Sequence, residues 1–344
     1  MLRPTVVLLI LGLFVLLHGL NVARRQYSFQ HYLRERQITA NDFPAPYVTV
    51  LNDSVLHGEQ PPLDFDYKST FTKSKIPRTI HFIWYQNLYS THNGGSQIPA
   101  AISRAPELCR QFNPDYDIKI WNATTGREFF ATEYAWFLPT YDGYRYPIQR
   151  IDALKYFVLY HYGGVYMDLD IACRRPLDPL LAFPAWFPEA SPLGVNNDLF
   201  AAAPGHPILK RMTQSLEAHN KNWIFPYLTI FYSTGPQFSS DILKEWYEHY
   251  KNNGLEVEGK GPDQATPSAF FILPQIYYSE QYTFFGHSPG GTWHGGDVAV
   301  VLWFVDHPWA LLLVVAVLAA AAYTWRKRRQ SLSRDRTLDK SNAV

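Results

Sequence analysis

Residues 147–171 read PIQRIDALKYFVLYHYGGVYMDLDI, and this run combines a helix signal with a strand signal. Apolar side chains at Ile151, Leu154 and Val158 recur every three to four positions after a proline, which predicts a helix. The glycine pair that follows ends this helix, and the apolar residues after the pair predict a buried strand. The run therefore predicts a helix, a tight turn and a strand that stops at two aspartates.

The same alternation extends to both sides of this run. Further strands are predicted at 79–84, 116–120 and 270–273, and further helices at 99–112, 124–138, 206–220 and 238–250. Helices that alternate with short apolar strands are typical of an α/β domain with a largely parallel sheet. Residues 26–75 show no sustained periodicity and contain several prolines, so they are predicted to be an irregular lead-in.

The pattern Asp-x-Asp occurs three times, at Asp64/Asp66, Asp115/Asp117 and Asp168/Asp170. Only the third pair follows an apolar strand, and ligands of open α/β sheets bind beyond the carboxyl ends of the strands. Two carboxylates projecting there are costly unless a cation offsets their repulsion, and oxygen ligands suit Mg²⁺ or Mn²⁺. The alternative is that this pair caps a turn and binds Arg174 and Arg175.

The composition excludes some classes of protein. The 344 residues are 47% hydrophobic and contain 55 aromatic side chains, which excludes a disordered chain. The net charge of +1 is unevenly distributed, because residues 326–344 carry +5 and residues 26–325 carry −7. An acidic central region is a poor surface for nucleic acid, so no nucleic-acid partner is expected.

Two uncharged apolar segments, at 5–20 and 308–325, are close to the minimum length of a membrane-spanning helix. The basic cluster after the second segment predicts that both termini are cytoplasmic and that the middle of the chain is lumenal. A cleaved signal peptide is the alternative for the first segment. The predicted organisation is a cytoplasmic N-terminus at 1–4, an anchor at 5–22, a lumenal stem at 23–75, a catalytic domain at 76–297, a transmembrane helix at 307–325 and a basic cytoplasmic tail at 326–344.

The two cysteines, Cys109 and Cys173, are too few for a disulfide framework or a four-sulfur zinc site. Cys173 follows the aspartate pair and is expected to be a buried free cysteine. Two glycosylation acceptor triplets begin at Asn52 and Asn122, which suits a lumenal domain.

Residues 152–170 strongly resemble the glycosyltransferases that contain the Asp-x-Asp sugar-binding motif. Within that group they look most like the fungal mannosyltransferases that modify inositol phosphorylceramide. Further matches are Ile76-Pro-Arg-Thr-Ile-His-Phe-Ile-Trp84, Asn196-Asn-Asp-Leu-Phe-Ala-Ala-Ala-Pro-Gly-His-Pro207, Ser233-Thr-Gly-Pro236 and Gly290-Gly-Thr-Trp-His294. The resemblance implies a GT-A type α/β fold and retaining transfer of mannose from GDP-mannose, with Mn²⁺ or Mg²⁺ as cofactor.

The resemblance also implies roles for particular residues. Asp168 and Asp170 would bind the cation across the donor diphosphate, with His287, or else His294, as a third ligand. Asp152 would join the two aspartates in the catalytic set. The donor-binding residues implied are Trp84, which would stack on the nucleobase, together with Arg150, Asp152, Lys155, Asn197, Asp198 and Trp293. Lys155 stands where the family often has arginine, and Arg150 is one helical turn away from it.

The two apolar segments favour a lipid acceptor, inositol phosphorylceramide, because they would hold the site close to the membrane. The expected location is the Golgi membrane, with the endoplasmic reticulum and the vacuole as alternatives, and a regulatory membrane subunit is a candidate partner. Three other functions stay open. They are mannose transfer to protein-linked glycans, hydrolysis of a phosphodiester by a metal enzyme, and a non-catalytic regulatory or lipid-binding membrane subunit.

Overall fold

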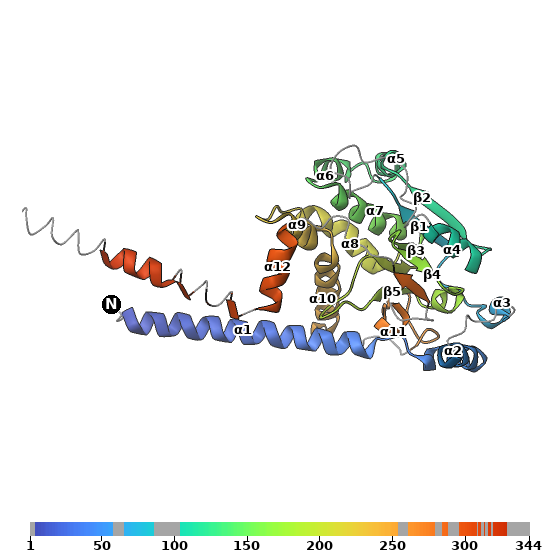
Figure 1. Ribbon diagram of the computed structural model, residues 1–344, viewed down its shortest axis with the longest axis horizontal. Helices are drawn as coiled ribbons and strands as arrows, with labels where there is room; N and C mark the ends of the chain where they lie inside the picture. Colours follow the sequence, from blue (N-terminus) through green and yellow to red (C-terminus); the bar gives the residue numbers. More distant parts are fainter. Residues whose placement is uncertain are drawn as a thin grey trace, which may run out of the picture. The chain divides into compact units, whose positions relative to one another are not determined.

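The computed structural model describes residues 4–57, 65–85, 104–253, 261–278, 284–287, 296–307 and parts of 309–328 (Figure 1). The chain divides into two units. One comprises residues 1–224 and 228–293, and the other comprises residues 225–227 and 294–344. In the second unit, the backbone NH of Tyr227 donates to Asp297 at 2.8 Å.

The first unit contains both sheets. The strands are β1 (Thr79–Ile83), β2 (Asp117–Trp121), β3 (Gly164–Met167), β4 (Ile171–Cys173), β5 (Ala185–Pro188), β6 (Leu199–Ala202), β7 (Phe271–Leu273) and β8 (Phe285–His287). Six of them form a sheet in the order β2-β1-β3-β6-β5-β7, in which only β6 runs against its neighbours, and β4 pairs with β8. The predicted α/β class and mostly parallel sheet are therefore confirmed.

The described part of the chain also contains helices of different lengths. They are α1 (Pro4–Glu35), α2 (Ala45–His57), α3 (Tyr67–Thr70), α4 (Arg104–Phe112), α5 (Ala123–Glu133), α6 (Leu138–Gly143), α7 (Pro147–Tyr162), α8 (Pro207–His219), α9 (Pro226–Ser233), α10 (Pro236–Asn252), α11 (Gln275–Tyr278) and α12 (Gly296–Asp306), with 3₁₀ turns at Ala40–Asp42 and Asp178–Ala182. Most of the predicted helices and strands are present within a few residues of their expected ends. The predicted strand after the glycine pair is split into β3 and β4 by the aspartate turn.

The glycine pair is required by the backbone of the turn between α7 and β3. Gly163 and Gly164 have φ angles of 66° and 105°, which side chains with a Cβ rarely adopt. A Cβ on Gly164 would also lie 2.6 Å from the carbonyl oxygen of Thr79 on the neighbouring strand. The pair thus lets α7 reverse directly into the centre of the sheet, next to β1.

Apolar side chains cover both faces of the six-stranded sheet. Tyr166 and Phe200 belong to one buried cluster, which includes residues of α7, α8 and α10. Val165 and Met167, which alternate with Tyr166 along β3, belong to a second cluster with residues of α2 and α4. This alternation buries β3 on both sides, so the residues that follow its end are held by a rigid element.

The prediction that residues 26–75 form an irregular lead-in is wrong for its described part. The last turns of α1 bury Phe29 and Tyr32 in the first cluster, where Tyr32 stacks on Tyr247 of α10 at 4.5 Å between ring centroids. In α2, Tyr47 is fully buried in the second cluster. The anchoring residues are a few widely spaced aromatics, which leave no periodic pattern in the sequence.

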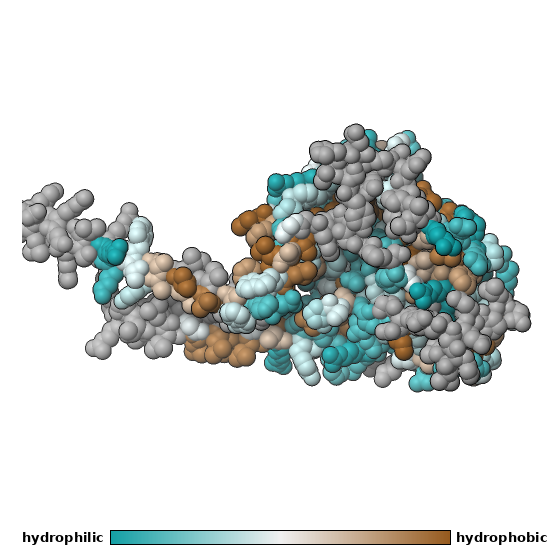
Figure 2. All heavy atoms as spheres, in the orientation of Figure 1, coloured by the Kyte–Doolittle hydropathy of each residue, from teal (hydrophilic) through white to brown (hydrophobic). Residues whose placement is uncertain are grey.

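Membrane-spanning helices were predicted at 5–22 and 307–325. In the portion of the chain that the structure describes, none of the helices combines the length and the apolar character needed to cross a membrane. Some residues of the second segment, such as Pro308, lie outside the described residues. On α1, a group of large apolar side chains is exposed (Figure 2), namely Leu13, Phe14, Leu16, Leu17, Leu20 and Val22.

The expectation of a buried free cysteine is also wrong, because Cys109 and Cys173 form a disulfide. Cys109 lies on α4 and Cys173 ends β4, and both are buried. The disulfide joins two elements that are 64 residues apart in the chain and lie against each other. Spacing alone did not indicate this pairing, because two cysteines in a long chain carry no framework pattern.

Removing the disulfide should destabilise the fold without leaving an unpaired thiol if both cysteines are replaced together. We expect Cys109→Ala/Cys173→Ala to lower the free energy of unfolding by about 2–5 kcal/mol, because the cross-link restricts the unfolded chain. Thermal unfolding of the full chain in detergent would measure the change. Wild-type protein treated with dithiothreitol should unfold like the variant, and an unchanged unfolding temperature in both would contradict the prediction.

Candidate active site

The pairing of β3 with β6 brings two aspartates together. Met167 at the end of β3 lies opposite Leu199 at the start of β6, and the two strands are antiparallel. Asp168 therefore lies beside Asp198, and its backbone NH donates to the Asp198 carbonyl at 2.7 Å. Residues that are 30 positions apart in the sequence thus meet at the carboxyl end of the central strand.

The second aspartate of the pair and one predicted metal ligand are positioned by the small sheet. Asp170 directly precedes β4, and Ile171 at the start of β4 is in register with His287 of β8. The His287 imidazole lies 3.0 Å from the Tyr278 carbonyl oxygen and packs edge-on against the Tyr278 ring. The structure thus brings His287 to the strand that begins next to Asp170.

Helix α7 supplies a buried ion pair behind the aspartate turn. Asp152 and Lys155 are one turn apart, and the Lys155 Nζ lies 2.7 Å from an Asp152 carboxylate oxygen. Lys155 also approaches the Asp168 carboxylate at 3.9 Å and lies over the Tyr166 ring. The Lys155 side chain is only 2% exposed, so its charge acts on the carboxylates with little screening by water.

Asp152 is held by a hydrogen-bond network rather than exposed to a ligand. Thr234 donates its hydroxyl hydrogen to one Asp152 oxygen at 2.9 Å, and Asn197 donates to the other at 3.2 Å. The same Asn197 amide also donates to the Tyr156 hydroxyl at 3.0 Å. Asp152 and Asn197 are 4% and 6% exposed, so the predicted donor contacts of these two residues would have to be made from within this network.

The structure adds residues that sequence reasoning did not assign to the site. Tyr166 donates a hydrogen bond to Asp168, and Tyr278 donates one to Asp198. Thr234 lies in the Ser233-Thr-Gly-Pro236 motif, so a signal for it existed. No sequence pattern pointed to Tyr278, which approaches the site only through the packing of α11 near β8.

The carboxylates at the end of β3 are difficult to ionise together. Burial, and then the charges of Asp168 and Asp198, raise the pKa of Asp170 to about 7. Burial, and then the charge of Asp168, raise the pKa of Asp198 to about 6. The pKa of Lys155 is raised despite its burial, because the carboxylates of Asp152 and Asp168 stabilise its ammonium form. Negative charge is therefore in excess at this turn.

A divalent cation fits the chemistry of this turn. The Oδ1 atom of Asp198 is buried and accepts no hydrogen bond from the described residues, which leaves an oxygen available to a cation. Asp168, Asp170 and Asp198 offer hard oxygen ligands of the kind that Mg²⁺ and Mn²⁺ prefer. Within the described ranges, however, no three histidine, cysteine or acidic side chains already converge in a metal-binding arrangement.

The structure places Trp84 and Arg150, two further predicted donor-binding residues, in different positions relative to this turn. Trp84 directly follows β1, which is parallel to β3, so it lies at the same edge of the sheet as Asp168. Arg150 instead donates to the carbonyl groups of Tyr141, in α6, and of Tyr144, directly after α6, and does not take part in the Lys155 ion pair. The predicted residues Trp293 and His294 lie outside the described residues.

Asp66 and Asp115, from the other two Asp-x-Asp motifs, have local structural roles. Asp66 caps α3 by accepting from the Ser69 backbone, and Asp115 forms an exposed ion pair with Lys68. The alternative that the third pair binds neighbouring arginines is not observed. Arg175 is buried beside Tyr47, where burial lowers the pKa of its guanidinium.

Comparison with known proteins gives the class to which this site belongs. Residues 99–186 match the family model described as the glycosyltransferase sugar-binding region containing the DXD motif. That range includes α7, β3 and both aspartates of the turn. Among solved structures, the PaToxG glycosyltransferase is similar over 60% of this chain and 82% of its own, with 15% identity and a TM-score of 0.40.

Curated relatives show which family of glycosyltransferases the chain is similar to. Inositol phosphoceramide mannosyltransferase 2 of Schizosaccharomyces pombe is 35% identical over 266 residues, covering 75% of this chain and 70% of the relative. Inositol phosphoceramide mannosyltransferase 3 of the same yeast is 38% identical over 71% of this chain and 62% of the relative. Mannosyl phosphorylinositol ceramide synthase SUR1 of Saccharomyces cerevisiae is 39% identical over 67% of this chain and 55% of the relative. The chain thus spans less than two thirds of the last two relatives. It belongs to the family of the inositol phosphoceramide mannosyltransferases.

The buried ion pair between Lys155 and Asp152 predicts that replacing Lys155 strongly lowers the free energy of unfolding. Lys155→Met removes the ammonium group but leaves the buried Asp152 carboxylate without its partner, so we expect the free energy of unfolding to fall by about 3–5 kcal/mol. The double variant Asp152→Asn/Lys155→Met removes both charges and should recover a large part of the loss. Chemical denaturation of the wild type and the two variants measures both changes. A single variant as stable as the wild type would refute the role given to Lys155.

Proposed function

We propose that this protein is a metal-dependent, retaining mannosyltransferase that moves mannose from GDP-mannose to inositol phosphorylceramide. The observation that carries the proposal is the group formed by Asp168, Asp170 and Asp198 at the carboxyl end of β3, in a chain of this family. Two of these carboxyl groups have strongly raised pKa values, so the turn is suited to a cation that also holds a diphosphate. The GT-A type of fold is part of the same proposal.

Different residues of the chain would have different roles at such a site. The aspartates Asp168 and Asp170 would hold the cation, which stabilises the negative charge of the departing nucleoside diphosphate as a Lewis acid. Lys155 balances part of the carboxylate charge from the buried side, and Tyr166 fixes the orientation of Asp168. Trp84 would stack on the nucleobase, because it follows the strand next to β3 and aromatic faces bind bases.

The acceptor and the compartment follow from different observations. The curated relatives are named as inositol phosphoceramide mannosyltransferases, so this lipid is the proposed acceptor. The disulfide suits an oxidising lumen, and the exposed apolar side chains near Leu17 on α1 suit attachment to a membrane. We therefore propose that the enzyme acts at the lumenal face of the Golgi membrane.

An acceptor assay separates the lipid from the glycan alternative. The purified full chain would be given GDP-mannose with inositol phosphorylceramide and a mannose-rich glycan in the same reaction. Mannosylated lipid as the main product supports the proposal. Extension of the glycan with no lipid product would instead identify a glycan mannosyltransferase, and no product from either acceptor would favour a non-catalytic protein.

Removing one ligand of the proposed cation should abolish transfer. We expect Asp170→Asn to lower the rate of mannose transfer by about 100-fold or more, because the developing diphosphate charge would lose its cation. EDTA should have the same effect on the wild type, and added Mn²⁺ should reverse it. The matched control is Asp117→Asn, since Asp117 belongs to another Asp-x-Asp pair and is the exposed first residue of β2. Full activity in Asp170→Asn would overturn the cation role.

The raised pKa values predict how cation binding depends on pH. Asp198 and Asp170, with pKa values of about 6 and 7, are largely protonated in mild acid and must lose protons to bind a cation. Affinity for Mn²⁺ should therefore rise by about tenfold or more between about pH 5 and about pH 8, with release of protons. Calorimetry in buffers of different ionisation enthalpy measures both quantities. An affinity independent of pH would show that these carboxyl groups do not bind the ion.

A further inference from the structure

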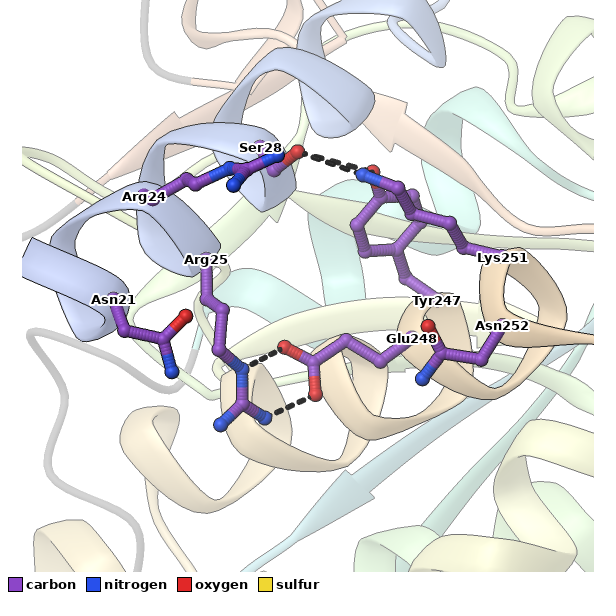
Figure 3. Close-up of a pocket in the computed structure, with 8 residues that line it drawn as sticks. All are labelled: Asn21, Arg24, Arg25, Ser28, Tyr247, Glu248, Lys251 and Asn252. Carbon is purple, nitrogen blue, oxygen red and sulfur yellow. Dashed lines mark hydrogen bonds and ion pairs between the residues drawn. The ribbon is translucent and has the colours of Figure 1, made fainter. Parts of the chain in front are cut away.

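A polar cavity lies between α1 and α10, apart from the aspartate turn. It has a volume of about 380 Å³ and is lined by residues of the two helices (Figure 3), namely Asn21, Arg24, Arg25, Ser28, Tyr247, Glu248, Lys251 and Asn252. All of these residues belong to the first unit. The volume is in the range of small-molecule sites and is large enough for a phosphate group joined to a hydroxylated headgroup.

The charges of the cavity lining are unbalanced. Arg25 binds Glu248 through two of its nitrogens, so this pair is neutral (Figure 3). Lys251 donates to the hydroxyl oxygens of Ser28 at 3.0 Å and Tyr247 at 3.2 Å rather than to an acid. Within the described part of the chain, Arg24 has no carboxylate partner. Two positive charges and several hydrogen-bond donors are thus available to an anion.

The cavity is distinct from the proposed active site. Near the start of α10, Ser239 contacts the Tyr156 hydroxyl, which belongs to the network around Asp152. Lys251 lies 12 residues further along the same helix, which corresponds to a separation of about 18 Å. An anion in the cavity would therefore bind away from the carboxylates at the end of β3.

The position of the cavity on α1 indicates where its ligand comes from. The group of exposed apolar side chains from Leu13 to Val22 on α1 reaches the cavity, whose lining begins at Asn21. Leu13, Phe14 and Leu17, which are 56–68% exposed, lie within the preceding two to three turns. Along α1, an apolar surface is thus followed by a positively charged cavity. A ligand with apolar chains and an anionic headgroup would contact both, whereas a free anion would contact only the cavity.

We propose that the cavity between α1 and α10 binds the phosphodiester headgroup of an anionic membrane lipid. Arg24 and Lys251 supply the charge that attracts the phosphate, and Asn21, Ser28 and Asn252 supply hydrogen-bonding groups for the headgroup. The exposed apolar side chains of α1 contact the lipid chains. This site positions the enzyme on the membrane and does not depend on which sugar or acceptor the active site uses.

Vesicle flotation of the purified full chain tests the proposal. The vesicles consist of phosphatidylcholine alone or of phosphatidylcholine mixed with phosphatidylinositol, an anionic phosphodiester lipid. We expect the wild type to prefer the mixed vesicles and Arg24→Gln/Lys251→Gln to lose about fivefold or more of that affinity. The matched control is Lys210→Gln/Lys221→Gln, which removes two exposed charges elsewhere in the first unit. The charge-preserving variant Arg24→Lys/Lys251→Arg should keep most of the affinity.

Each outcome decides for or against the proposal. Equal binding by the wild type and the Arg24/Lys251 variant would overturn it, and so would an equal loss in the Lys210/Lys221 control, which would indicate general attraction between charges. Displacement from mixed vesicles by inorganic phosphate would identify a site for soluble phosphate instead. Mannose transfer to an acceptor dispersed in detergent should be unchanged in the Arg24/Lys251 variant, so a failure of lipid binding is separable from a failure of the proposed enzyme activity.

Discussion

The structure around the end of β3 depends on balancing several carboxylates with one buried ammonium group. The charge of Asp168 acts on Asp152, Asp170 and Asp198, and Lys155 is a cation that faces this group from α7. Bringing acidic groups together in a partly buried place costs free energy unless the charge is compensated. Lys155 compensates Asp152 directly at 2.7 Å, while burial and then the charge of Asp168 raise the pKa values of Asp170 and Asp198.

The residues at this site fall into two layers. Asp168 is 37% exposed at its side chain and can reach a ligand. Asp152 is surrounded by Lys155, Asn197 and Thr234, and its carboxylate oxygens are already engaged. We infer that Asp152 acts by holding Lys155 in place. This interpretation differs from the direct donor contact implied by family resemblance, and it follows from the burial of the carboxylate.

The sequence predicted the parts of this arrangement that arise from local patterns. The periodicity of α7, the glycine pair and the apolar run of β3 were enough to place Asp168 at the carboxyl end of a central strand. The contact between Asp168 and Asp198 depends on the register of β6 against β3, which no local pattern specifies. The packing of Tyr32 on Tyr247 and the pairing of Cys109 with Cys173 likewise join distant segments, so the predictions of an irregular lead-in and of a free Cys173 were both wrong.

Paired strands hold the turn from Asp168 to Asp170 in place before and after it. The repulsion between its carboxylates makes this support necessary. Before the turn, β3 is held in the sheet by β1 and β6, and after it β4 is paired with β8 and tied to α4 through Cys173. Mutual repulsion between the carboxylates would otherwise favour a backbone that moves them apart. The flanking strands and the disulfide oppose that movement, so burial and then the remaining repulsion between the carboxylates raise the pKa values of Asp170 and Asp198. A turn held in this way keeps its excess of negative charge ready for a cation, without a rearrangement of the backbone when the cation binds.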